Sequence, residues 1–275
     1  MPLTVEIPAA LKVALDEEIA RLGADQSAIV TAALSKYLGV PAHTLFQVSI
    51  SGALVAGVYD AEVSVKSILE RGDFGLGTFA NLDGEMVVLD GRGYQVRGTG
   101  SVSEAASDAG APFAVVTRFS PEIETDTGPI ASFKDLEDCC DRYRDSGNIF
   151  YAMRLDGYFN RVRTRAVNPP SPGTRLVDAA KAQSEFSFTA VEGTLVGLWS
   201  PGFSSAFSIP GYHFHFISND RRQGGHLLDV EAEQLRLKVE ALTDFHLALP
   251  ASEAFLKADL SKNTAQELAY AEQGH

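Results

Sequence analysis

From about Leu45 onward, the chain consists of short apolar runs that are separated by an acidic residue followed by glycine. Pairs of this kind lie between two apolar runs at Asp83-Gly84, Asp90-Gly91, Asp156-Gly157 and Glu192-Gly193. They are typical of β-hairpins, because tight turns need positive φ angles that glycine adopts without steric cost. The pattern therefore predicts antiparallel strands that are connected by turns.

Helical patterns are few in this part of the chain. They occur near residues 64–72, 135–147 and 265–272. Short strands with occasional helices favour an α+β fold that is rich in β-strands and built on two β-sheet units. The proline-rich stretch at residues 169–173 is the best position for an internal boundary, or else a loop between the sheets.

The first forty residues follow a different pattern. The run LTVEI is typical of a short strand, and apolar residues then recur at helical spacing until Gly23. A second helix is expected between Asp25 and Gly39. This strand, helix, helix order resembles a ribbon-helix-helix segment, a small fold that is stable only as an intertwined dimer. We expect residues 1–42 to form such a segment, residues 43–275 to form the main region, and the protein to be a homodimer.

Charge and hydropathy exclude two classes of partner. The chain carries 36 acidic and 23 basic residues, a formal net charge of -13, which repels phosphate backbones and anionic lipids. No apolar run approaches the roughly 20 residues of a membrane-spanning helix, and the first residues show no basic leader before a hydrophobic block. We expect a cytoplasmic protein that acts on a small molecule and binds neither nucleic acid nor membranes.

Two histidines alternate with two phenylalanines in the run YHFHF, and a third histidine follows a polar, glycine-rich stretch. On a strand, His213 and His215 share one face. Their backbones are roughly 6.6 to 7 Å apart, so both rings can converge on one ion. Residues 218–225 are typical of a loop between antiparallel strands, and His226 can therefore lie opposite the pair.

Three imidazoles with an open fourth position are a ligand set that catalytic zinc commonly shows. The chain has 6 histidines, and His213, His215 and His226 are half of them. This clustering favours a metal site over three ordinary core or surface histidines. Imidazole also suits copper, iron, nickel and manganese, so the spacing alone does not name the metal.

Three blocks in the same order resemble the signature blocks of the alpha-acetolactate decarboxylase family, namely GDFGLGTFANLDGEMVVLDG, YAMRLDGYFNRVRTRAV and GYHFHFISNDRRQGGHLLDV. The resemblance extends from about Phe46 to Glu272 and does not include the N-terminal segment. It implies two α/β units built on β-sheets, with zinc in one of them. It also implies a decarboxylase that converts (S)-2-acetolactate to (R)-acetoin and carbon dioxide.

The resemblance assigns the zinc ligands to His213, His215 and His226. It assigns the other site residues to Thr78, Glu85, Arg165 and Glu272, with Glu267 as a competitor for the last position.

Taken without the family, these residues have simpler interpretations. Glu85 follows a turn and could be a solvated strand residue. Arg165 alternates with Arg161 and Arg163, so all three could lie on an exposed, charged strand face.

The chemistry of a 2-hydroxy-3-ketoacid suggests roles for these groups. Loss of carbon dioxide leaves an electron pair that the neighbouring ketone accepts, and a cation at that oxygen lowers the barrier. Arg165 would orient the substrate carboxylate, because a pKa above about 12 makes arginine a poor acid. Glu85 and Glu272 would supply acid–base chemistry or additional zinc ligands.

Two other interpretations remain open from the residues alone. One is a different three-histidine metalloenzyme, such as a dioxygenase or a hydrolase. The other is a regulator that senses a ligand and binds DNA through its N-terminal segment, although that segment places Thr4 and Glu6, not basic side chains, on its first strand.

Overall fold

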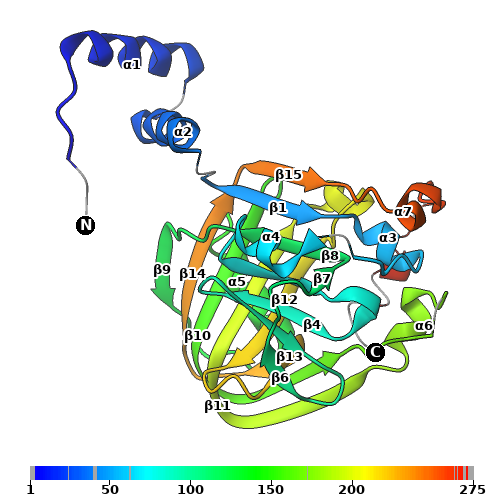
Figure 1. Cartoon of the computed structure of the whole chain (residues 1–275). Coiled ribbons are helices and arrows are strands. Elements are labelled where there is room, and N and C mark those ends of the chain that lie inside the picture. Colours follow the sequence, from blue (N-terminus) through cyan, green and yellow to red (C-terminus); the bar gives the residue numbers. More distant parts are fainter. Residues whose placement is uncertain are drawn as a thin grey trace. The chain divides into compact units, whose positions relative to one another are not determined.

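The computed structural model describes residues 4–23, 25–39, 42–61, 63–171, 173–262, 264, 266–268 and 271. The chain divides into two compact units, Met1–Ala42 and His43–His275 (Figure 1).

The N-terminal unit contains the two expected helices, α1 (Ala9–Leu22) and α2 (Gln26–Leu38). Helix α1 ends at Gly23, whose left-handed backbone lets its N–H donate to the carbonyl of Ile19. The strand expected over LTVEI is not formed: residues 4–8 have no strand partner among the described residues, and residues 1–3 lie outside them. An isolated strand leaves its backbone groups unpaired, so it needs a second strand to be stable.

The first sheet of the larger unit has seven strands. Their order is β15 (Asp244–Ala248), β1 (Thr44–Val48), β8 (Phe113–Thr117), β3 (Phe74–Thr78), β4 (Glu85–Leu89), β5 (Arg92–Val96) and β6 (Val102–Glu104). Strands β1 and β15 are parallel, and the other neighbours are antiparallel.

Two of the predicted hairpins lie in this sheet. Asp90 and Gly91 both have positive φ and connect β4 to β5 in a two-residue turn. Strands β3 and β4 also pair, but residues 79–84 join them through a short 3-10 helix, η1 (Ala80–Leu82).

The second sheet has six strands in the order β11 (Ser184–Ser200), β12 (Gly211–Ser218), β13 (Gly224–Glu231), β10 (Phe150–Ala166), β14 (Leu235–Leu242) and β9 (Ile123–Asp126). Strand β10 also pairs with β11, so β10, β11, β12 and β13 close into a ring. The hairpin predicted for the stretch with the histidines is formed by β12 and β13.

The hairpins predicted at Asp156-Gly157 and Glu192-Gly193 are wrong. Strands β10 and β11 run through these positions without a turn, and Gly157 lies directly opposite Gly193. Close packing explains the glycines here: a Cβ on Gly193 would lie 2.5 Å from the ring of Phe216, and one on Gly157 would lie 2.8 Å from the side chain of Leu235.

Short helices and a small two-stranded sheet complete the unit. They are α3 (Ser51–Val55), β2 (Val63–Ser64), α4 (Val65–Leu69), β7 (Gly110–Ala111), α5 (Phe133–Asp141), α6 (Leu176–Ala180), η2 (Gly202–Ala206) and α7 (Glu253–Lys257). Helices α4 and α5 lie where the sequence predicts them. Of the predicted C-terminal helix, residues 266–268 and 271 are helical, and the remainder lies outside the described residues. Residues 169–173 belong to the connection between β10 and α6.

The two large sheets share one hydrophobic core, which confirms the predicted β-rich α+β fold. Leu76 and Val87 of the first sheet cluster with Val196 and Ile217 of the second, and all are at most 1% exposed. Burial of each such side chain stabilises the fold by about 1.5–3 kcal/mol. This packing brings β12 against β4, which places the histidine strand beside the start of the strand that begins with Glu85.

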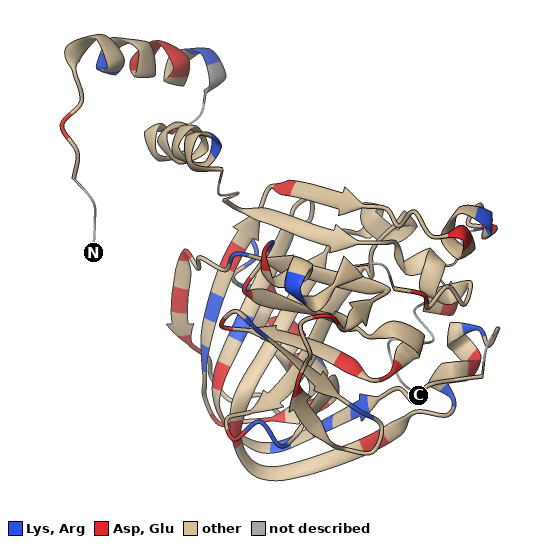
Figure 2. Cartoon of the chain, viewed as in Figure 1, with Lys and Arg blue, Asp and Glu red and all other residues tan. Residues whose placement is uncertain are grey.

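Strand β9, at the edge of the second sheet, carries acidic residues, and its neighbour β14 carries basic residues opposite them (Figure 2). Arg236 pairs with Glu124 and Asp126, and Lys238 lies near Glu124. Such exposed ion pairs contribute little to stability, because water and salt screen them. Within the described part of the chain, no helix combines the length and the apolar character that crossing a membrane requires.

Candidate metal centre and active-site cavity

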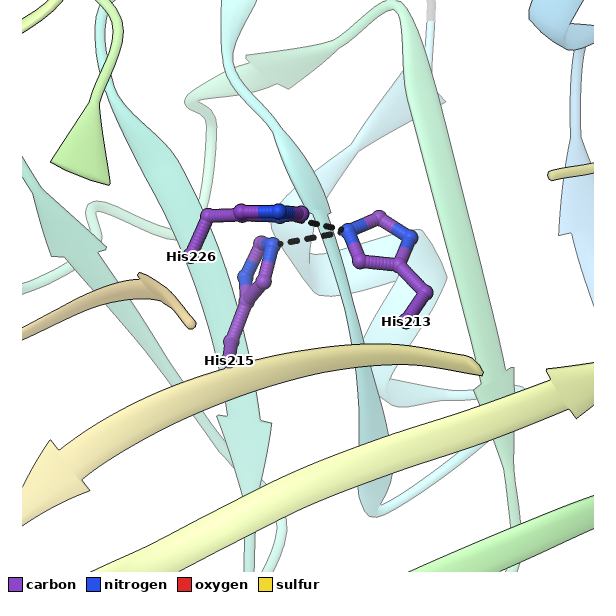
Figure 3. Close-up of side chains that lie close together, drawn as sticks. All are labelled: His213, His215 and His226. Atoms are coloured by element: carbon purple, nitrogen blue, oxygen red, sulfur yellow. Dashed lines mark hydrogen bonds between the residues drawn. The ribbon is translucent and has the colours of Figure 1, made fainter. Parts of the chain in front are cut away.

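The rings of His213, His215 and His226 point toward one another (Figure 3). His213 and His215 lie on β12 and share a face, and His226 on β13 is the direct cross-strand partner of His215. The predicted arrangement of the three imidazoles is therefore formed. The glycines before His226 permit it, since a Cβ on Gly225 would lie 2.5 Å from the carbonyl oxygen of Arg165 on β10.

The distances between the ring nitrogens fit a single ion. Nε2 of His213 lies 3.1 Å from Nε2 of His215 and 3.0 Å from Nδ1 of His226. One nitrogen from each ring lies within 4.8 Å of the other two. Nitrogens bound tetrahedrally at about 2.0–2.1 Å from one zinc ion would be separated by roughly 3.3 Å, which is close to the two distances from His213.

The protonation states of the rings also favour a cation. Nδ1 of His215 donates to the carbonyl oxygen of Met86 at 2.8 Å. Nε2 of His215 therefore carries no proton, and its lone pair is directed at His213. Burial lowers the pKa of His213 to about 3 and that of His215 well below its ordinary value, and Arg165 lowers both pKa values further. Neutral imidazoles whose lone pairs face one another repel unless a cation or a proton lies between them.

A cavity in the larger unit borders His213. Its polar lining consists of Thr78, Glu85, Arg165 and His213. The apolar lining includes Leu54, Leu82, Phe113, Val167, Leu176, Ala180 and Ile209. Residues far apart in the sequence therefore meet around one apolar space with a few convergent polar groups.

Glu85 lies at the start of β4, opposite Thr78 of β3. It is 7% exposed, and its Oε1 accepts a hydrogen bond from the backbone N–H of Val167 at 3.2 Å. Its Oε2 lies 3.8 Å from Nε2 of His215. The simpler interpretation of Glu85 as a solvated strand residue is therefore wrong. Thr78 donates its hydroxyl proton to the carbonyl of Gly84, which holds the connection that leads into Glu85.

Arg165 is 4% exposed, and its Nη1 donates to Oε1 of Gln183 at 2.6 Å. The two arginines that alternate with it on β10 pair with acidic residues: Arg161 with Glu231 and Asp229, and Arg163 with Glu185. The register of β10 against β13 shifts between Arg163 and Thr164. Alternation alone therefore does not decide which arginine reaches the cavity.

Comparison with known proteins agrees with this geometry. The sequence profile of the alpha-acetolactate decarboxylase family matches residues 45–262. The chain belongs to this family.

The relatives cover most of the chain. An alpha-acetolactate decarboxylase of Methanosarcina mazei is 40% identical over 225 residues, which are 82% of this chain and 78% of the relative. One of Brevibacillus brevis is 35% identical over 233 residues, or 84% of this chain and 82% of the relative. The crystal structure of an alpha-acetolactate decarboxylase from Bacillus subtilis superposes with a TM-score of 0.81 at 33% identity, covering 84% of this chain and 100% of that one.

The C-terminal glutamate that the alpha-acetolactate decarboxylase resemblance assigns is Glu272, which lies outside the described residues. Its competitor Glu267 is described: its Oε2 lies 2.5 Å from Nη2 of Arg175, and it is not among the residues that line the cavity. Ala271, however, does line the cavity.

Sequence reasoning missed three groups that contact the site residues. These are the carbonyl of Met86, the N–H of Val167 and the side chain of Gln183. Backbone groups leave no mark in the sequence, because every residue carries them. Gln183 lies 18 positions from Arg165, and only the pairing of β10 with β11 brings the two together.

Proposed function

We propose that the chain converts (S)-2-acetolactate to (R)-acetoin and carbon dioxide with a zinc ion held by His213, His215 and His226. The observation that carries the proposal is the convergence of three buried or half-buried imidazoles at a cavity that also holds Glu85 and Arg165. Membership in the alpha-acetolactate decarboxylase family supports the same reaction.

The zinc ion, when bound, would supply a Lewis acid that stabilises negative charge on substrate oxygen. Two features of the chain prepare its ligands. The Met86 carbonyl fixes the tautomer of His215, and burial keeps His213 and His215 neutral.

Arg165 would bind the carboxylate that leaves as carbon dioxide. The guanidinium is a permanent cation with several donors in one plane, a geometry that matches a carboxylate. Oriented in this way, the C–C bond to the carboxylate can align with the neighbouring ketone, which accepts the electron pair when the bond breaks. No separate organic electron acceptor is needed, because the substrate is already a β-keto acid.

Glu85 would handle the proton that the product needs. After carbon dioxide leaves, the carbon that carried it must gain one proton on one face to give a single acetoin enantiomer. Glu85 is buried and lines the cavity, and the N–H of Val167 fixes the orientation of its carboxyl group. Glu272 is proposed as a second acid or base, since its neighbour Ala271 borders the same cavity.

An assay on racemic 2-acetolactate tests the proposal directly when it is combined with elemental analysis of the purified protein. We expect zinc as the bound metal and (R)-acetoin as the product. Bound iron with oxygen uptake during turnover, and no acetoin, would instead support a dioxygenase.

We also propose that the protein is a homodimer held together by a ribbon-helix-helix-like arrangement of residues 1–42. None of the residues 4–39 whose side chains are described is buried. Large apolar side chains are exposed on both helices, including Leu11 at 60%, Leu34 at 48% and Tyr37 at 87%. A unit of this size cannot build a stable core alone, and a second copy would cover these side chains.

Substitution of Leu34 by aspartate tests the dimer. The charge would lie in the proposed contact, so light scattering should show a change from dimer to monomer, while acetoin formation per chain stays within about twofold. A dimer that persists at micromolar concentration would contradict a contact through this helix.

Gel-shift experiments should show no sequence-specific DNA binding, in keeping with the net charge of -13.

The proposed location is the cytoplasm. Cys139 and Cys140 are both free and buried, which fits a reducing compartment. Cell fractionation followed by immunoblotting would test this location.

A further inference from the structure

Gln183 accepts a short hydrogen bond from the guanidinium of Arg165. Its Oε1 lies 2.6 Å from Nη1, shorter than the usual range for a charged donor. Gln183 does not line the cavity, whereas Arg165 does. The amide therefore contacts the guanidinium without itself lining the cavity.

The backbone around Gln183 is held in place from both sides. The Asn168 side chain donates to the carbonyl of Ala182 at 2.9 Å and to the hydroxyl of Ser184 at 3.1 Å. Asn168 lies two residues after the end of β10, the strand that carries Arg165. Hydrogen bonds therefore connect the residues on both sides of Gln183 to the chain just after β10, near Arg165.

The same connection continues into a wall of the cavity. Helix α6 ends at Ala180, and both Leu176 and Ala180 line the cavity. Gln183 is therefore fixed relative to the cavity wall as well as to Arg165. A side chain held in this way can transmit a defined orientation to the guanidinium.

We propose that Gln183 is a positioning residue that sets the orientation of the Arg165 guanidinium for the substrate carboxylate. This inference rests on the proposed function, since it assumes that Arg165 binds the carboxylate of a 2-hydroxy-3-ketoacid. An amide suits this role, because its oxygen accepts a hydrogen bond without adding negative charge. A carboxylate at the same position would attract the guanidinium and repel the anionic substrate.

Two substitutions separate orientation from charge. Gln183→Met keeps most of the volume but removes the acceptor, so kcat/KM should fall about 10- to 100-fold, the usual effect of losing a hydrogen bond to a charged group. Gln183→Glu keeps an acceptor but adds a charge, so KM should rise about tenfold while kcat changes less. Zinc content and melting temperature should stay as in the unchanged protein. Gln234→Glu, at an exposed turn, adds the same charge away from the cavity and serves as the control.

A double-substitution cycle shows whether Gln183 acts through Arg165. In an Arg165→Lys background, Gln183→Met should cause little further loss, because lysine lacks the planar guanidinium that Gln183 is proposed to orient. Full additivity of the two losses would overturn the proposal, and so would kcat and KM values within twofold of the unchanged protein for both Gln183 variants.

The role of Gln183 can also be tested without turnover, by measuring the affinity for 2,3-dihydroxy-2-methylbutanoate with calorimetry. This probe has the carboxylate but lacks the ketone, so it cannot lose carbon dioxide by the same route. We expect Gln183→Glu to weaken its binding about tenfold, and unchanged binding would overturn the inference even if acetoin is formed. Absence of acetoin from the unchanged protein would refute the proposed function, while a weakened probe affinity would still support the role of Gln183.

Discussion

The larger unit contains two places where imidazole and glutamate meet in or near its interior, and they differ in one respect. At the first, Glu85 lies 3.8 Å from His215, and the three histidine rings converge beside the cavity. At the second, Nδ1 of His43 lies 3.3 Å from Glu240 and 3.6 Å from Glu122. Both contain a carboxyl group that is at most 7% exposed.

Convergence of ligand atoms separates the two places. Among the described residues, His213, His215 and His226 are the only group of three or more metal-binding side chains whose donor atoms gather around one point. His43 is a single ring between two carboxylates, and it is not among the described residues that line the cavity beside His213. Burial and proximity of histidine to glutamate are thus insufficient for a site. Several donors must be directed at one position that a small molecule can reach.

Removal of one ring from each place should give the largest contrast. His213→Ala takes away a nitrogen that lies within 3.1 Å of both other rings, so metal and acetoin formation should both be lost. His43→Ala should keep both, because His43 is not among the residues that line the cavity. Elemental analysis and the acetoin assay measure these outcomes. Full activity in a His213→Ala protein that is verified to be free of metal would exclude zinc from the reaction.

Amide substitution of the two buried glutamates should give the next contrast. Glu85→Gln should retain zinc, because the three histidines remain, but lose turnover by about 10²- to 10⁴-fold as a general acid or base is removed. Glu240→Gln should leave kcat unchanged. Wild-type kcat in Glu85→Gln would show that its carboxyl group does not transfer the proton.

The smallest effect concerns stability and pH. Burial raises the pKa of Glu240 from its ordinary value of 4.5 to about 8; a hydrogen bond from the N–H of Ser120 opposes this shift, and the charges of Glu122 and Asp73 add to it. The folded protein therefore keeps a proton that the unfolded chain releases above about pH 4.5. The protonated carboxyl of Glu240 therefore contributes fully to the free energy of unfolding below about pH 4.5. This contribution is lost as the pH rises to about 8, by at most ~1.4 kcal/mol per pH unit.

Denaturant unfolding at pH 5 and pH 8 checks this prediction. Glu240→Gln should show a weaker pH dependence than the unchanged protein and should be the more stable of the two at pH 8. An equal slope for both proteins would mean that Glu240 is not the group that titrates.

Sequence patterns predicted the convergence of His213, His215 and His226 but misjudged the long strands. His213 and His215 share a face of β12, as predicted, because alternate residues of a strand point to the same side. The turns predicted at Gly157 and Gly193 failed, because glycine marks a close approach as readily as a turn. Only the neighbouring strands, here carrying Phe216 and Leu235, distinguish the two cases.

The sequence alone determined the β-rich composition, the helices of the first forty residues, the turn at Asp90-Gly91 and the shared face of two histidines, all of which depend on contacts between residues close in the chain. The tertiary structure decided that Glu85 lies beside His215, that Arg165 and not Arg161 reaches the cavity, and that Gln183 contacts Arg165. Strand pairing and sheet packing set these relations between distant residues. A local pattern cannot encode them, because it does not specify which strands become neighbours.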